Sequence, residues 1–72
     1  MSMTLGEFAY VIDAEPKWVQ NAASALGAPF PHTLPTARRL LIARAVSDET
    51  GMPLARAYRV AEEALHRYDG SV

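Results

Sequence analysis

The stretch TLGEFAYVIDAEPKWVQNAASAL, residues 4–26, decides the fold because it contains the start and stop signals of two short helices. Thr4 is followed three residues later by Glu7, a pattern in which each side chain accepts a hydrogen bond from the backbone amide of the other at a helix start. Apolar side chains then recur at helical spacing, at Leu5, Phe8, Ala9 and Ile12. The stretch therefore begins with a predicted helix over residues 5–12, which a tight turn at residues 13–14 ends.

A second helix is predicted over residues 16–26. Pro16 suits the first turn of a helix because it has no amide hydrogen to lose there, and Gly27 supplies the left-handed residue that commonly ends one. The face expected to be buried consists of Val19, Ala22, Ala23 and Leu26. The opposite face consists of Lys17, Gln20, Asn21 and Ser24. This helix is therefore expected to turn a polar side with two amide groups outward.

Two longer helices are predicted over residues 35–50 and 53–68. The segment of residues 28–35, which precedes these two helices, contains three prolines. Because prolines disrupt both regular helices and central strands, this segment is expected to form a loop or a tiny hairpin. The apolar positions of the third helix are Leu40, Leu41, Ala45 and Val46. Those of the last helix are Leu54, Ala57, Tyr58, Ala61, Ala64, Leu65 and Tyr68. The pattern predicts an all-α fold of four helices.

Length and composition indicate one small globular domain. The chain has 72 residues, of which half are hydrophobic, and it contains no cysteine. Disulfides and thiolate metal sites are thereby excluded, and the N-terminus shows neither a signal peptide nor a transmembrane segment, so we expect a cytoplasmic protein that does not engage the membrane. Seven Lys and Arg residues stand against eight Asp and Glu residues, yet no acid lies between Glu15 and Asp48. The middle of the chain is therefore locally cationic.

The second predicted helix carries the residues best suited to reading DNA. Two short helices joined by about three residues, the second with a polar outward side, are the parts that place a helix in the major groove. The amides of Gln20 and Asn21 can pair with adenine, and Lys17 can reach a phosphate or a guanine. The plainer alternative is that Lys17, Gln20, Asn21 and Ser24 only solvate an exposed helix face.

The proline-rich segment and the arginines after it are a second candidate DNA contact. Arg38 and Arg39 can neutralise phosphates if the segment lies along the DNA backbone as a reduced wing. In the alternative, Phe30 and Leu34 fill the core from a loop while both arginines lie in water. The sequence leaves both open.

From about residue 4 to residue 65 the sequence resembles the N-terminal domain of MerR-type winged-helix regulators. Residues 16–20, Pro-Lys-Trp-Val-Gln, are similar to the start of the family's recognition helix, which runs proline, lysine, threonine, an apolar residue and arginine. An apolar pair and a following glycine lie in residues 40–51, and Pro53 with Leu54 opens the last helix. The resemblance implies a four-helix winged helix-turn-helix with a short proline-rich wing, and it adds His32 and Thr33 to the expected DNA contacts.

The resemblance does not extend to the long dimerisation helix and effector domain of full-length MerR-type regulators. We therefore expect a stand-alone module like the small excisionases, a fragment of a longer protein, or the DNA-binding part of a toxin–antitoxin pair. A chain of this size offers few phosphate contacts, so useful specificity is expected to need a homodimer on adjacent half-sites.

A second hypothesis is a protein-interaction module such as an antitoxin, which binds a cognate toxin or another protein. Its contact residues would be Trp18, Tyr58, Val60 and Leu65. Trp18 lies beside the apolar stripe of its helix, a position that suits a core or subunit contact. Val60 lies off the stripe of the last helix, where it is expected to mark a small exposed patch. Both hypotheses can hold together, as they do for antitoxins that repress their own operon.

Neither an enzyme nor a metal protein is expected. His32 and His66 are far apart in the sequence and have no further ligand at a recognised spacing, while Glu62 and Glu63 are adjacent and point in different directions on a helix. The sequence also has no nucleophile elbow, P-loop or dinucleotide-binding glycine motif. We therefore expect no catalytic residues, no metal and no cofactor.

Overall fold

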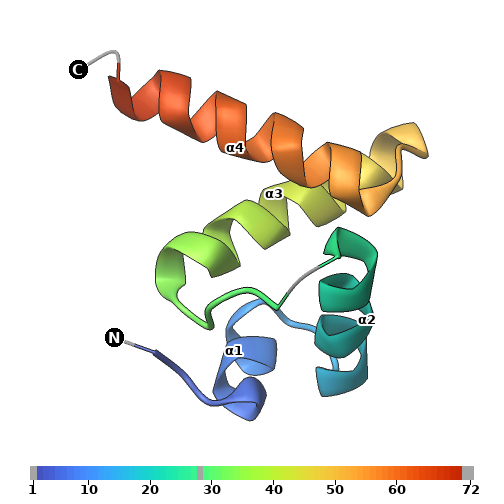
Figure 1. The fold of residues 1–72 in the computed structure, drawn as a ribbon, viewed down its shortest axis with the longest axis vertical. Coiled ribbons are helices and arrows are strands. Elements are labelled where there is room, and N and C mark those ends of the chain that lie inside the picture. Colours follow the sequence, from blue (N-terminus) through green and yellow to red (C-terminus); the bar gives the residue numbers. More distant parts are fainter. Residues whose placement is uncertain (1, 28, 71–72) are drawn as a thin grey trace. The chain divides into compact units, whose positions relative to one another are not determined.

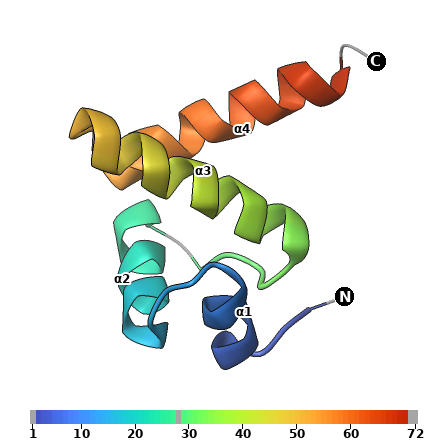
Figure 2. The same cartoon turned by 180° about the vertical axis from the view of Figure 1, so that it is seen from behind.

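The computed structural model describes residues 2–27 and 29–70, and within them it contains four α-helices and no strand. The helices are α1 (Leu5–Val11), α2 (Pro16–Leu26), α3 (Leu34–Thr50) and α4 (Leu54–Gly70), as Figures 1 and 2 show. The predicted all-α class is confirmed, and each predicted helix is present with ends that differ by at most two residues.

The chain consists of two compact units, Met1–Arg38 and Arg39–Val72. The first unit contains α1, α2 and the start of α3, and the second contains the rest of α3 and α4. That all 72 residues form one domain stays a prediction. None of the helices in the part of the chain that the structure describes has the length and apolarity of a membrane span.

The start of α1 has the predicted reciprocal cap. The Thr4 amide donates to the Glu7 carboxylate at 2.9 Å, and the Glu7 amide donates to the Thr4 hydroxyl at 3.1 Å. Two amides that the helix itself cannot satisfy are thereby paired, and such a cap contributes about 1 kcal/mol to stability. The helix buries the aromatic ring of Phe8, and Ala9 and Ile12 are buried beside it on the predicted stripe.

A short turn connects α1 to α2, and the two helices contact one another. Asp13 has a φ of 54°, in the left-handed region, which aspartate tolerates better than most residues. Glu15 is extended before Pro16, and Gly27 closes α2 with a φ of 84°. Both ends of α2 are therefore as predicted.

The buried face of α2 is narrower than expected. Val19 and Ala22 are buried, but Ala23 and Leu26 are only half-buried. The sequence pattern gives the direction of a helix face, whereas the degree of burial depends on what the fold places against it. The prediction is therefore right for two positions of this face and too strong for the other two.

Aromatic packing anchors residues 29–33, the segment predicted as a wing. The ring of His32 stacks on that of Phe8 with centroids 4.8 Å apart, and the Phe30 ring lies 5.9 Å from the same phenyl. The backbone carbonyl of His32 accepts a hydrogen bond of 2.7 Å from the Met3 amide. Residue 28 lies outside the described residues, and 29–33 contain no strand, so a wing hairpin is not confirmed.

The second unit is built on an alanine contact between α3 and α4. Ala43, Ala57 and Ala61 are fully buried together. Small side chains let two helix backbones approach closely. Dispersion attraction between the closely packed atoms then contributes the stability that larger side chains contribute in other cores. The partly buried residues packed around them are Ile42, Val46, Met52, Leu54 and Tyr58.

Side-chain hydrogen bonds fix the corner between α3 and α4. The Ser47 hydroxyl donates to the Met52 carbonyl at 2.7 Å, and the Thr50 hydroxyl donates to the Val46 carbonyl at 2.6 Å. The Met52 amide then donates to the Thr50 oxygen at 3.1 Å. Gly51 has a φ of 74°, the left-handed conformation that commonly ends a helix.

Four apolar positions predicted to face the core are exposed. They are Leu41 and Ala45 in α3, and Ala64 and Tyr68 in α4. In α3 the buried side consists of Thr36, Ala37, Leu40 and Ala43. The polar Thr36 was not expected there, and its hydroxyl lies 3.1 Å from that of Thr33, which satisfies its hydrogen-bonding need.

Candidate nucleic-acid interface

Two short helices, α1 and α2, contact one another and are joined by a short connection. Four residues, 12–15, lie between the two helices, and one of them has the left-handed backbone that glycine often supplies in such a turn. Buried Phe8 and Ala9 on α1, and Val19 and Ala22 on α2, occupy the inner sides. The polar side of α2 is thereby turned away from this core.

All four polar residues of α2 that the sequence singles out are exposed. They are Lys17, Gln20, Asn21 and Ser24. The spacing i, i+3, i+4, i+7 places them on one side of the helix. None of these side chains has a hydrogen bond or ion pair with another residue in the described part of the chain. Their donors and acceptors are available to a ligand without breaking an internal contact.

The charge of the first unit is unevenly distributed. Its carboxylates, at Glu7, Asp13 and Glu15, all precede α2, whereas its two cations are Lys17 and Arg38. Arg38 is exposed, while Arg39 is half-buried and belongs to the second unit. The amide face of α2 therefore has a cation, and no acid, on its own helix.

The two residues that the wing prediction adds are already engaged within the first unit. His32 is half-buried with its ring against Phe8, and Thr33 is half-buried with its hydroxyl near Thr36. The alternative prediction for this segment is right for Phe30, which contacts Phe8, and wrong for Leu34, which is 66% exposed. The segment thus packs mainly through its aromatic rings.

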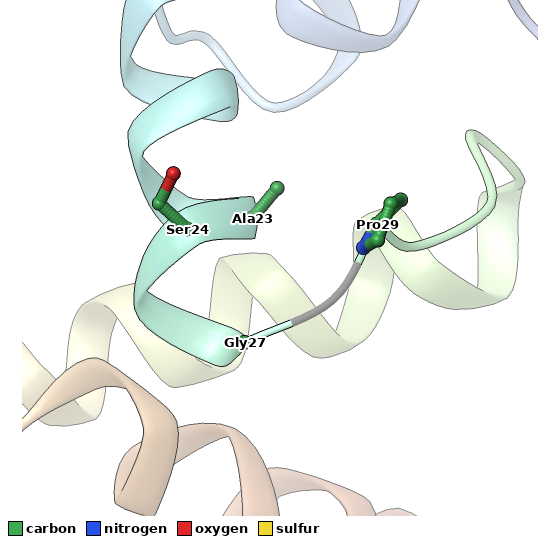
Figure 3. A pocket seen from close by; sticks show the side chains of 4 residues that line it. All are labelled: Ala23, Ser24, Gly27 and Pro29. Atoms are coloured by element: carbon green, nitrogen blue, oxygen red, sulfur yellow. The ribbon is translucent and has the colours of Figure 1, made fainter.

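A shallow hollow lies at the end of α2, between the helix and the segment that follows it. Figure 3 shows its lining, Ala23, Ser24, Gly27 and Pro29. Its volume is about 330 Å³, and Ser24 contributes its one polar side chain. Within the described residues, no three His, Cys, Asp or Glu side chains gather closely enough to hold a metal.

The four residues assigned to a protein partner do not form one patch within a unit. Trp18 is half-buried in the first unit, whereas Tyr58, Val60 and Leu65 lie on α4. Val60 is 41% exposed, as its place off the apolar stripe predicts. Tyr58 and Leu65 are half-buried, and Tyr58 packs against the alanine contact.

Sequence reasoning missed one exposed apolar pair, on α1. Tyr10 is 87% exposed and Val11 is 42% exposed. Both lie off the stripe of Leu5, Phe8, Ala9 and Ile12, and that position was the available signal.

Comparison with protein-family models, with curated proteins and with solved structures finds no match to this chain.

Proposed function

We propose that this chain binds double-stranded DNA in the cytoplasm, with α2 lying in the major groove, and acts as a small transcriptional regulator. One observation carries the proposal. The polar side chains of α2 follow a short connection from α1, are all exposed, and have no internal partner among the described residues. A buried or internally bonded amide pair would have removed its basis.

The chemistry of the amide face suits adenine. Gln20 and Asn21 each carry one donor and one acceptor that match N6 and N7 of adenine in the major groove. Each good bidentate pair discriminates against the wrong base by about 1–3 kcal/mol. We therefore expect half-sites that contain adenine at the positions that α2 reaches.

Contacts to phosphate would come from Lys17, Ser24 and Arg38, with Arg39 as a further candidate. A protein that neutralises about three phosphates loses roughly 40-fold in affinity when salt rises from about 50 to 200 mM. A single copy therefore binds weakly, and a homodimer on two half-sites would double the number of phosphates contacted.

The finer architecture, a MerR-type winged helix-turn-helix, is part of the same proposal. Its support is the sequence resemblance and the α1–turn–α2 connection, with residues 29–33 as a reduced wing. Because His32 and Thr33 are half-buried, they would touch DNA only through the parts of their side chains left exposed.

The decisive experiment measures DNA binding by fluorescence anisotropy, with a pool of random duplexes at low salt and then with the duplexes selected from it. Gln20→Ala with Asn21→Ala should weaken the selected sites by about tenfold or more and leave random duplexes nearly unaffected, because base contacts carry the discrimination. His66→Ala, an exposed polar residue on α4, is the matched control and should leave both unchanged.

The phosphate contribution has its own matched pair. Arg38→Ala should weaken all duplexes alike and reduce the salt slope by about one. Arg59→Ala removes an equally exposed arginine from α4 and should leave the slope as it is. No binding at low salt would overturn the DNA-binding proposal, and equal losses for the two arginine variants would overturn the phosphate contact of Arg38.

The alternative, a protein-interaction module such as an antitoxin that uses α4, is favoured by the exposure of Val60. Co-expression with the product of an adjacent gene, followed by purification of the wild type and of Val60→Asp, tests it. A partner retained only by the wild type supports this function, and equal retention argues against it.

A further inference from the structure

The outer side of α1 carries an aromatic and an aliphatic side chain that the core does not use. Tyr10 and Val11 follow Glu7 by three and four residues, a spacing that puts all three on one side of the helix. Tyr10 is 87% exposed and Val11 is 42% exposed, while Phe8 and Ala9 of the same helix are buried. We name Glu7, Tyr10 and Val11 the α1 outer face.

Exposed tyrosine beside exposed valine is a composition typical of protein contacts. A tyrosine ring supplies a large apolar area and a hydroxyl that can pair, with few rotatable bonds to immobilise on binding. Aromatic residues are enriched in the centres of protein interfaces for this reason. Isolated exposed apolar residues are ordinary, but Tyr10 and Val11 both lie next to Glu7, one helical turn before them, on the exposed side of α1.

Fixed negative charge borders the α1 outer face. Hydrogen bonds from the amide and then the hydroxyl of Thr4 lower the pKa of Glu7, so its carboxylate is charged at neutral pH. Glu15 is also exposed, in the connection that follows α1. No cation lies in residues 2–16, so the nearest cation along the chain is Lys17 of α2.

The sign of this charge selects the occupant. Phosphate oxygens are repelled by carboxylates, which makes the α1 outer face a poor surface for DNA. Lysine and arginine side chains are attracted to it, and their long apolar stems can also pack on an aromatic ring. The complementary partner is therefore both cationic and apolar.

We propose that the α1 outer face docks a basic amphipathic segment of another protein, with an apolar side chain against Tyr10 and Val11 and a lysine or arginine beside Glu7. The docking does not depend on the DNA-binding proposal, because it uses α1 and leaves the amides of α2 free. If both hold, the chain joins a DNA site to a basic protein partner.

Three synthetic helical peptides test the docking on the full 72-residue chain labelled with ¹⁵N. One has a leucine face and a lysine face, the second has glutamate in place of lysine, and the third has serine in place of leucine. The leucine–lysine peptide should shift the amide signals of residues 7–11 and bind at least about tenfold more tightly than either of the others.

Variants assign the site. Tyr10→Ser with Val11→Ser should reduce the affinity for the leucine–lysine peptide by at least about tenfold. Glu7→Gln, which removes the charge and keeps the side-chain oxygen for the Thr4 cap, should reduce it by a smaller factor and weaken its salt dependence. Leu41→Ser, at a similarly exposed aliphatic side chain on α3, is the matched control and should bind as the wild type does.

Three results would overturn the docking proposal. Equal affinity of the three peptides would show that the α1 outer face does not distinguish basic from acidic or apolar from polar peptides. Signal shifts confined to α4 would show that the peptide binds elsewhere. Self-association of the wild type that the Tyr10 and Val11 double variant loses would assign the face to a second copy. The same double variant, titrated with duplex DNA, should bind as the wild type does, so the two proposals can fail separately.

Discussion

The two units of this chain are stabilised by different kinds of side chain. In the first unit a few large groups gather, with the rings of Phe8, Phe30 and His32 within about 6 Å of one another. In the second, Ala43, Ala57 and Ala61 form the buried centre of a helix pair. Bulky rings tolerate irregular backbone around them, whereas an alanine contact requires two regular helices at close range.

This difference in packing also determines which helix sides each unit leaves exposed for binding. Irregular segments and short helices in the first unit leave one side of α2 and one side of α1 unused by the core. The long helices of the second unit instead bury small residues and expose mixed charges. The proposals of DNA binding through α2 and of docking on α1 therefore rest mainly on the first unit, whereas the alternative protein-interaction module would use α4 of the second. Changes in stability can test whether the two units depend on different side chains.

The largest effect is expected from Phe8→Ala. Phe8 is fully buried and contacts both other rings, so its loss removes apolar area and leaves a cavity, at a cost of about 3–5 kcal/mol in the free energy of unfolding. Urea denaturation followed by circular dichroism measures it. Leu34→Ala, at a side chain that is 66% exposed, is the control and should cost far less.

A larger side chain in the alanine contact should destabilise the second unit. Ala61→Leu inserts a larger side chain at a position with no exposed surface and should destabilise by about 1–3 kcal/mol. Ala64→Leu makes the same change one turn further along α4, where the side chain is exposed, and should alter the stability little. Equal effects in the same denaturation experiment would mean that close approach at Ala61 is unimportant.

The turn of the first unit should be sensitive to the backbone preference of residue 13. Asp13→Val places a β-branched residue at a φ of 54° and should cost about 1–2 kcal/mol, while Asp13→Gly relieves the backbone at that position. Thermal unfolding of both variants measures the difference. A valine variant as stable as the glycine variant would contradict the left-handed turn.

The smallest effect concerns the cap of α1. The pKa of Glu7 is lowered in the folded chain, so the stabilisation linked to its charge is present above the unfolded-state pKa and is lost as pH falls through the folded one. Thr4→Ala removes the hydroxyl and should raise the pKa of Glu7 toward its ordinary value. The loss of the N-cap side chain should lower the free energy of unfolding by about 1 kcal/mol. A carboxyl-detected NMR titration of both proteins measures the pKa.

Much of the helical framework follows from residues near the helix ends. The cap at Thr4, the proline at position 16 and the glycine at position 27 act on backbone groups within a few residues, so the sequence pattern predicts them well. The polar side of α2 was also predictable, because a period of 3.6 residues fixes which side chains share a face. The same rule identifies Gln20 and Asn21 as the candidate reading residues.

Burial and ring contacts were not predictable in the same way. The stack of His32 on Phe8 joins residues that are far apart in the chain, and a pattern of neighbouring residues cannot predict such a contact. Leu41 fits an apolar stripe as well as Leu40 does, yet it is 43% exposed while Leu40 is buried. The choice between them depends on which side of α3 the rest of the fold covers.

The sequence by itself determined where each helix begins and ends to within two residues, because the effects of a cap, a proline or a left-handed glycine act on the backbone of neighbouring residues. Only the tertiary structure decided which apolar side chains are used, leaving Tyr10 outside and placing His32 against a phenyl ring. The physical reason is that burial belongs to pairs of surfaces brought together from distant parts of the chain, and each surface alone is compatible with either outcome.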